Sequence, residues 1–142
     1  MARLEEQVRQ SIRTTMHGPR PDEKQIADLT VYLRSLAPPP PRGAPAEAAR
    51  RGEAVFASAG CAHCHAPPTY TTPRTYEVGV EDELGKKLFN PPSLRGVGHG
   101  VAFFHDGRAS TLDEMFTRHR HQLPAEMARK DLDDLLTFLR TL

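Results

Sequence analysis

The two cysteines of this chain stand three positions apart, in the sequence Cys61-Ala62-His63-Cys64-His65, and they constrain its fold more than any other feature. The pattern C-x-x-C-H is the attachment motif of c-type haem. Two thiols on one turn can each add to a vinyl group of the porphyrin, and the histidine directly after the second cysteine can bind the iron as its proximal ligand. Because a haem held by Cys61, Cys64 and His65 cannot dissociate, its apolar faces become part of the core.

Three other interpretations compete with haem attachment. A structural zinc site needs four cysteine or histidine ligands, usually as two pairs, and this sequence has one such pair with scattered histidines. A thioredoxin-like redox pair is expected between a strand and a helix, and no such pattern surrounds the motif. The motif could also occur by chance in a chain without a cofactor. We favour one covalent haem c, with His63 as a spacer that faces solvent.

The composition indicates a small domain that benefits from an apolar group bound inside it. Hydrophobic residues make up 38% of the 142 residues, tryptophan is absent, and 13 prolines imply long stretches without regular structure. A net charge of +1 gives no electrostatic reason to expect nucleic acid or an anionic membrane as a partner. Because no run of about 18 apolar residues occurs, we expect no membrane span.

The periodic segments all predict helices, so the expected fold class is all-α. Helical spacing, capping pairs and Gly-Pro stops delimit five helices and a proline-rich linker over residues 37–45. Residues 66–110 are rich in Pro, Gly and Thr and predict a long irregular loop. The predicted helices cover residues 3–16, 22–36, 46–58, 111–118 and 129–142.

A repeat links the two ends of the chain. Residues 28–36 (Asp-Leu-Thr-Val-Tyr-Leu-Arg-Ser-Leu) match residues 134–142 (Asp-Leu-Leu-Thr-Phe-Leu-Arg-Thr-Leu) at an offset of 106 positions. Two amphipathic helices can resemble each other without common origin. Alternatively, residues 1–36 are the tail of a preceding copy of the same domain, joined by the linker 37–45 to a complete haem domain at 46–142. In that case the chain is a fragment or a remnant of a two-haem protein.

Three strings downstream of the motif are more specific than the motif itself. They are residues 90–98 (Asn-Pro-Pro-Ser-Leu-Arg-Gly-Val-Gly), residues 103–109 (Phe-Phe-His-Asp-Gly-Arg-Ala) and residues 111–114 (Thr-Leu-Asp-Glu). In this order they resemble the C-terminal haem domain of the bacterial di-haem cytochrome c peroxidase and MauG-like family. The resemblance implies a class I cytochrome c-like haem domain with a long irregular loop, here preceded by an N-terminal helical hairpin. It also implies that the helix with Gly52 and Phe56 crosses the last helix near Phe138, where glycine lets the backbones touch.

The sixth iron ligand is the residue that decides the chemistry. In the family, the ligand lies 14 residues beyond the histidine of the His-Asp-Gly string, and 14 residues beyond His105 is His119. Peroxidases of the family usually have Met there and MauG-like proteins Tyr, so this sequence departs from both. We predict that His119 binds the iron opposite His65, with His121, Met115 and Met127 as alternatives.

Other residues of these strings have less specific roles. Arg95 is expected either to bind a haem propionate, because its planar fork suits a carboxylate, or to form a surface ion pair. The resemblance places Phe104 among the residues that contact the cofactor. His105-Asp106-Gly107 is expected to be a turn against the haem edge rather than a catalytic group, because Asp-Gly is a common turn pair.

Two functions follow from different classes of protein. A six-coordinate iron suits electron transfer, so we predict a c-type cytochrome domain that carries one haem and passes single electrons between redox partner proteins. The alternative is an enzyme, the haem domain of a di-haem peroxidase or MauG-like oxidase that acts together with a second haem domain or subunit. Because haem c is attached outside the cytoplasm, we expect a periplasmic or extracytoplasmic location, although residues 1–6 do not read as a signal peptide.

Overall fold

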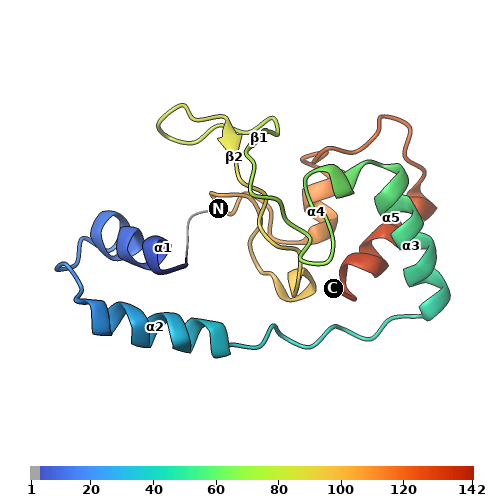
Figure 1. The fold of residues 1–142 in the computed structure, drawn as a ribbon. Coiled ribbons are helices and arrows are strands. Elements are labelled where there is room, and N and C mark those ends of the chain that lie inside the picture. The colour runs from blue at the N-terminus through green and yellow to red at the C-terminus, as the bar shows by residue number, and fades with distance from the viewer. Residues whose placement is uncertain (1–3) are drawn as a thin grey trace. The chain divides into compact units, whose positions relative to one another are not determined.

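The computed structural model describes residues 4–142 and divides the chain into two compact units, one ending at Pro38 and one spanning Pro39–Leu142 (Figure 1). The mostly helical character predicted from the sequence is confirmed. Residues 1–3, with which the predicted N-terminal tail begins, lie outside the described residues. The α-helices are α1 (Leu4–Gln10), α2 (Glu23–Ser35), α3 (Ala46–Ser58), α4 (Leu112–Thr117) and α5 (Arg129–Leu139).

The N-terminal unit consists of α1, a π-helical turn at Ser11–Thr15, and α2. Val8 of α1 and Ile26 of α2 are buried where the two helices pack together. Asp22 caps α2 as predicted, because its side chain accepts a hydrogen bond from the Gln25 backbone and Gln25 returns one to the Asp22 N–H. The π-helical turn was not predicted.

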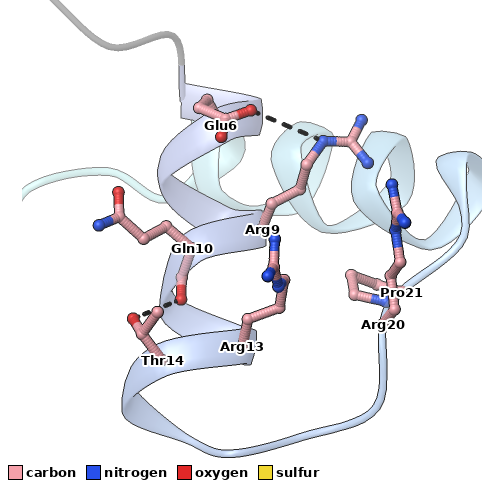
Figure 2. Close-up of a pocket in the computed structure, with 7 residues that line it drawn as sticks. All are labelled: Glu6, Arg9, Gln10, Arg13, Thr14, Arg20 and Pro21. Atoms are coloured by element: carbon pink, nitrogen blue, oxygen red, sulfur yellow. Dashed lines mark hydrogen bonds and ion pairs between the residues drawn. The ribbon is translucent and has the colours of Figure 1, made fainter.

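A pocket of about 260 Å³ lies on this unit (Figure 2). Three arginines line it, and of these Arg9 is paired with Glu6 at 3.9 Å and with Glu23 at 2.6 Å. The remaining lining residues are Gln10, Arg13, Thr14, Arg20 and Pro21. The pocket is therefore polar and basic.

The C-terminal unit is built on the crossing of α3 and α5. Its core contains eight buried hydrophobic side chains, from α3, α4 and α5, and the attachment motif follows α3 directly. These residues are Phe56, Leu112, Phe116, Leu132, Leu135, Leu136, Phe138 and Leu139.

The two helices touch at Gly52. A Cβ atom at this position would lie 1.9 Å from the Asp134 carbonyl oxygen and 2.7 Å from the Phe138 Cβ, so only glycine fits. Arg51, beside it, donates from Nε and Nη2 to the two carboxylate oxygens of Asp134 at 2.7 and 2.8 Å. Lys130 donates to the same carboxylate at 2.7 Å. These two cations hold the pKa of Asp134 well below its usual value.

The segment between the motif and α4 is mostly irregular, but it contains two short antiparallel strands, β1 (Tyr76–Glu77) and β2 (Leu88–Phe89). Tyr76 pairs with Phe89 and Glu77 with Leu88. The all-α prediction missed these strands because two residues cannot display an alternating pattern. Two 3-10 turns complete the unit, at Cys61–His63 and Val97–His99.

The proline segment is fastened to the C-terminal unit from Pro39 onward. His99 Nε2 lies 2.9 Å from the Pro40 carbonyl, and the Arg42 N–H donates to the Arg140 carbonyl at 3.0 Å. The predicted linker 37–45 is therefore divided by the boundary between the units at Pro38. Among residues 4–142, no helix is long and apolar enough to cross a membrane.

Candidate haem-attachment site

The attachment motif is presented by the end of α3. Gly60 adopts a left-handed conformation, with φ 77°, and ends the helix in the manner favoured by glycine. The chain then turns tightly, because the backbone N–H groups of Cys64 and His65 both donate to the Cys61 carbonyl, at 3.3 and 2.9 Å. One turn thus carries both cysteines and the histidine.

His65 is held by a backbone carbonyl in the orientation expected of a metal ligand. Its Nδ1 lies 3.1 Å from the Tyr70 carbonyl oxygen, which can only accept, so Nδ1 carries the proton and Nε2 keeps its lone pair. Metal-binding histidines are commonly oriented in this way. Burial lowers the pKa of His65, although the Tyr70 and Pro92 carbonyls oppose the effect, and the neutral imidazole is the form that binds metals.

The two cysteines are free thiols, and each is half-buried. Burial raises the pKa of both thiols. Cys61 packs against the hydrophobic core, as does Ala62 between the cysteines. The side chains that would form the thioether bonds are therefore part of the wall of the interior.

A largely apolar cavity of about 640 Å³ opens in front of the motif. This volume falls within the usual range for cofactor pockets. Cys61, Cys64 and His65 line one part of it, and aliphatic and aromatic side chains from α4, α5 and the long loop line the rest. Two thiols, an oriented imidazole and an apolar cavity fit a haem. The apolar lining includes Phe56, Leu94, Val97, Phe103, Phe104, Leu112, Met115, Phe116, Leu135 and Leu139.

Two histidines that follow α4 have buried nitrogens without a hydrogen-bond partner. These atoms are Nε2 of His119 and Nδ1 of His121. Because an unpaired buried nitrogen is costly, such an atom is suited to a ligand that the protein binds there. His121 lines the cavity, and its pKa is lowered by burial and by interaction with His65. His119 lies beside Phe104 and is not among the lining residues.

Phe104 contacts both histidines. Its ring meets that of His119 edge-on at a centroid distance of 5.4 Å and that of His121 at 5.5 Å. Three residues around this cluster have left-handed backbones although none is glycine: φ is 67° at Phe104, 51° at Arg120 and 50° at Gln122. A left-handed conformation costs an ordinary residue about 1–2 kcal/mol. The backbone is therefore strained on both sides of His121.

The remaining predicted site residues have different positions. Met115 lines the cavity, whereas Met127 packs against the core and is not among the lining residues. Arg95 is exposed and follows Leu94, which does line the cavity. Phe104 lines the cavity as well.

The His-Asp-Gly string forms a turn. Gly107 has a left-handed φ of 71°, and the Gly107 N–H donates to the Phe104 carbonyl. Hydrogen bonds from Arg108 lower the pKa of Asp106 to about 2. His105 stacks on Phe89 at a centroid distance of 4.7 Å. This string therefore shapes the loop beside the cavity.

Sequence reasoning missed the residue that orients His65. The contact uses the backbone carbonyl of Tyr70, and every residue carries such a group, so no sequence signal marks it. It also missed the contact of Phe104 with both distal histidines. The distance between these positions along the chain hides that contact.

The fold and the cavity define a c-type cytochrome domain, a helical unit in which the haem attachment motif faces an apolar pocket. The family model described as di-haem cytochrome c peroxidase matches residues 55–142. The chain therefore belongs to the di-haem cytochrome c peroxidase family.

Two curated proteins are similar to this chain. The methylamine utilization protein MauG of Methylorubrum extorquens is 28% identical over 120 residues, which covers 66% of this chain and 34% of that protein. The cytochrome c551 peroxidase of Nitrosomonas europaea is 28% identical over 109 residues, which covers 64% of this chain and 33% of that protein. The chain thus matches about a third of the length of these relatives.

Proposed function

We propose that the C-terminal unit holds one covalently bound haem c and passes single electrons between redox partner proteins. The observation that carries this proposal is the cavity itself, with Cys61, Cys64 and His65 on one wall and buried, unpaired histidine nitrogens nearby. When bound, haem c supplies an iron that cycles between the ferric and ferrous states. The chain's own residues fix it, exclude water from its faces and set its axial ligands.

His119 is the proposed sixth ligand. Its buried Nε2 without a partner supports this assignment, as does its position 14 residues after His105. His121 is the second candidate, since it lines the cavity and interacts with His65. With an imidazole on each side, no coordination position is left for peroxide. A histidine in place of methionine lowers the reduction potential, since methionine ligation raises it.

Phe104 and Arg95 have supporting roles in this proposal. Phe104 lies against His119 and His121 and restricts the rotation of both rings. Arg95, exposed beside the cavity-lining Leu94, is placed to bind a propionate at the solvent edge. Because haem c is attached outside the cytoplasm, we place the mature protein in the periplasm or another extracytoplasmic compartment.

An enzyme is the second candidate function. One of the two relatives is named a peroxidase, and both are about three times as long as the part matched here. In this alternative, residues 46–142 are one haem domain of a two-haem protein and residues 1–36 are the end of the preceding domain, with residues 37–45 between them. Hydrogen peroxide would then be reduced with the participation of the second haem domain or subunit.

The test is the EPR and visible spectrum of the ferric protein after maturation with haem in an export-competent host. A low-spin signal of two histidine ligands that ignores added peroxide is the expected result. A high-spin signal in the purified protein contradicts the relay and favours the enzyme, and the lack of covalent haem contradicts both.

Two matched variants assign the sixth ligand. His119→Ala is expected to convert the iron to high spin, whereas His121→Ala leaves the low-spin signal. The reverse result transfers the assignment to His121. If neither variant changes the spin state, Met115→Ala and Met127→Ala decide between the remaining alternatives.

A further inference from the structure

The repeat between the two ends of the chain extends to an ion pair. Lys24 Nζ lies 2.5 Å from an Asp28 carboxylate oxygen in α2, and 106 positions later Lys130 lies 2.7 Å from an Asp134 carboxylate oxygen in α5. In both helices the lysine is four positions before the aspartate. The two helices therefore share surface chemistry in the same register as well as their apolar pattern.

Burial separates the two copies of this pattern. Tyr32 of α2 is 59% exposed, whereas its counterpart in α5, Phe138, is 6% exposed. Leu29 and Leu33 are each 36% exposed, whereas Leu135 and Leu139 are buried. Helical spacing places four of these α2 side chains on one face, which we call the α2 stripe. The α2 stripe consists of Leu29, Tyr32, Leu33 and Leu36.

The other faces of α2 do not explain the α2 stripe. Ile26 and Thr30 are buried within the N-terminal unit, where α1 packs on α2. Val31 is 68% exposed but lies on the opposite side of the helix from Tyr32 and Leu36. A contiguous apolar face that includes an exposed tyrosine and three leucines is typical of a surface that binds another protein element.

The C-terminal unit shows what covers the same pattern in α5. The helix α3 crosses it with Gly52 against the Asp134 carbonyl and the Phe138 Cβ. Phe56 of α3 packs edge-on against Phe138 at a centroid distance of 5.4 Å. Arg51 completes the crossing by donating twice to the Asp134 carboxylate. The covering helix thus has the pattern Arg-Gly-x-x-x-Phe and leads into a haem attachment motif.

We propose that the α2 stripe is the docking surface for a helix like α3, from a second haem c domain, that has an Arg-Gly-x-x-x-Phe pattern before its attachment motif. The glycine would lie against the backbone at Asp28, and the phenylalanine against Tyr32. This proposal rests on the proposed function only in taking the partner to be a haem c domain.

Charge complementarity supports this occupant. The Asp28 side chain is 65% exposed, whereas that of Asp134 is 8% exposed because Arg51 and Lys130 both cover it. Asp28 already has the lysine of this arrangement. The arginine of a docking helix would supply the second cation and remove the carboxylate from solvent.

The test adds the expected partner to the full chain. A copy of the segment Ala46–Ser58 is attached ahead of the first residue through a flexible Gly/Ser linker, which gives an effective concentration in the millimolar range. Hydrogen exchange then reports the protection of the α2 amides. We expect exchange at α2 to slow about tenfold or more relative to the unfused chain, because docking removes the helix from solvent.

Matched variants identify the contact. A fused copy with Gly52→Leu cannot approach α2 closely and should give no protection, and Tyr32→Glu in α2 should also abolish it. Val31→Glu makes the same chemical change on the other side of the helix and should leave the protection intact. A fused copy with Arg51→Asp should fail to protect α2, and Asp28→Arg should restore the protection.

Several results would overturn the proposal. These are unchanged exchange at α2, equal protection by the Gly52→Leu copy, an equal effect of Val31→Glu and Tyr32→Glu, and protection of α5 in place of α2. The readout does not depend on haem. Covalent haem without protection of α2 therefore contradicts the docking surface alone, whereas protection in a chain that takes up no haem contradicts the relay alone.

Discussion

Gly52→Ala should separate the two helices that form the haem domain. The new Cβ would lie 1.9 Å from the Asp134 carbonyl oxygen and 2.6 Å from its carbonyl carbon. A carbon and an oxygen atom approach to about 3.3 Å at closest, so the helices must part by more than about 1 Å. The obstacle is backbone inside α5, which cannot rotate away as a side chain could.

The magnitude follows from two opposing effects. An added methyl group in a packed core costs about 1–3 kcal/mol, and the backbone contact places this site near 3 kcal/mol. Alanine recovers about 1 kcal/mol of helix propensity relative to glycine. The net loss of about 2 kcal/mol should lower the melting temperature of a domain of this size by roughly 8–16 °C.

Thermal unfolding followed by circular dichroism measures this loss on the haem-loaded protein. Gly43→Ala is the matched control, because no atom lies within 4 Å of a Cβ at that position in the proline segment. The control should stay within about 0.5 kcal/mol of the wild type. A melting temperature for Gly52→Ala equal to that of Gly43→Ala would refute the close crossing of α3 and α5.

Three further predictions concern the charge pair at the crossing, the attachment motif and the strained phenylalanine. The pKa of Asp134 is lowered in the folded chain, so its charge stabilises the fold above the usual aspartate pKa of about 4 and this contribution is lost as the pH falls. The difference in urea midpoint between the wild type and Arg51→Gln should therefore be large at neutral pH and shrink below pH 4, and a constant difference would contradict the pairing. Cys64→Ser leaves one thiol for attachment, so haem staining and intact mass should show a lower yield of covalently loaded protein; an unchanged yield would exclude a role for this thiol. Because Phe104 has a φ of 67°, Phe104→Gly should unfold at a higher urea concentration than Phe104→Ala, by about 1 kcal/mol in stability, and equal midpoints would contradict the left-handed backbone.

The elements that the sequence predicts well depend on near neighbours along the chain. The capping pair Asp22 and Gln25 is three positions apart, and both of its hydrogen bonds are present. At α4 the same rule holds in part, because Thr111 accepts from the Glu114 backbone N–H. The Glu114 carboxylate, however, accepts from the backbone and hydroxyl of Ser110 rather than from the Thr111 N–H. A local rule thus predicts the helix start, and the available donors decide the detail.

The elements that the sequence did not reveal depend on distant partners or on single backbone atoms. Strands β1 and β2 pair through two residues each, so their existence is decided by the path of the loop and not by periodicity. The carbonyl of Tyr70 orients His65, and nothing in the identity of a tyrosine predicts that contact. The crossing at Gly52 was predictable only because glycine, at a position before the motif, has a steric reason to be there.

The distal side of the cavity shows why counting positions is insufficient to choose an iron ligand. His119 and His121 are two residues apart, yet both rings pack against Phe104 at nearly the same distance. The left-handed backbones of Arg120 and Gln122 make this possible, because each reverses the local direction of the chain. A count from His105 identifies His119, whereas the cavity lining contains His121. The spacing carries the habit of the family and the lining carries the path of this chain, so the two single-histidine variants test two separate physical arguments.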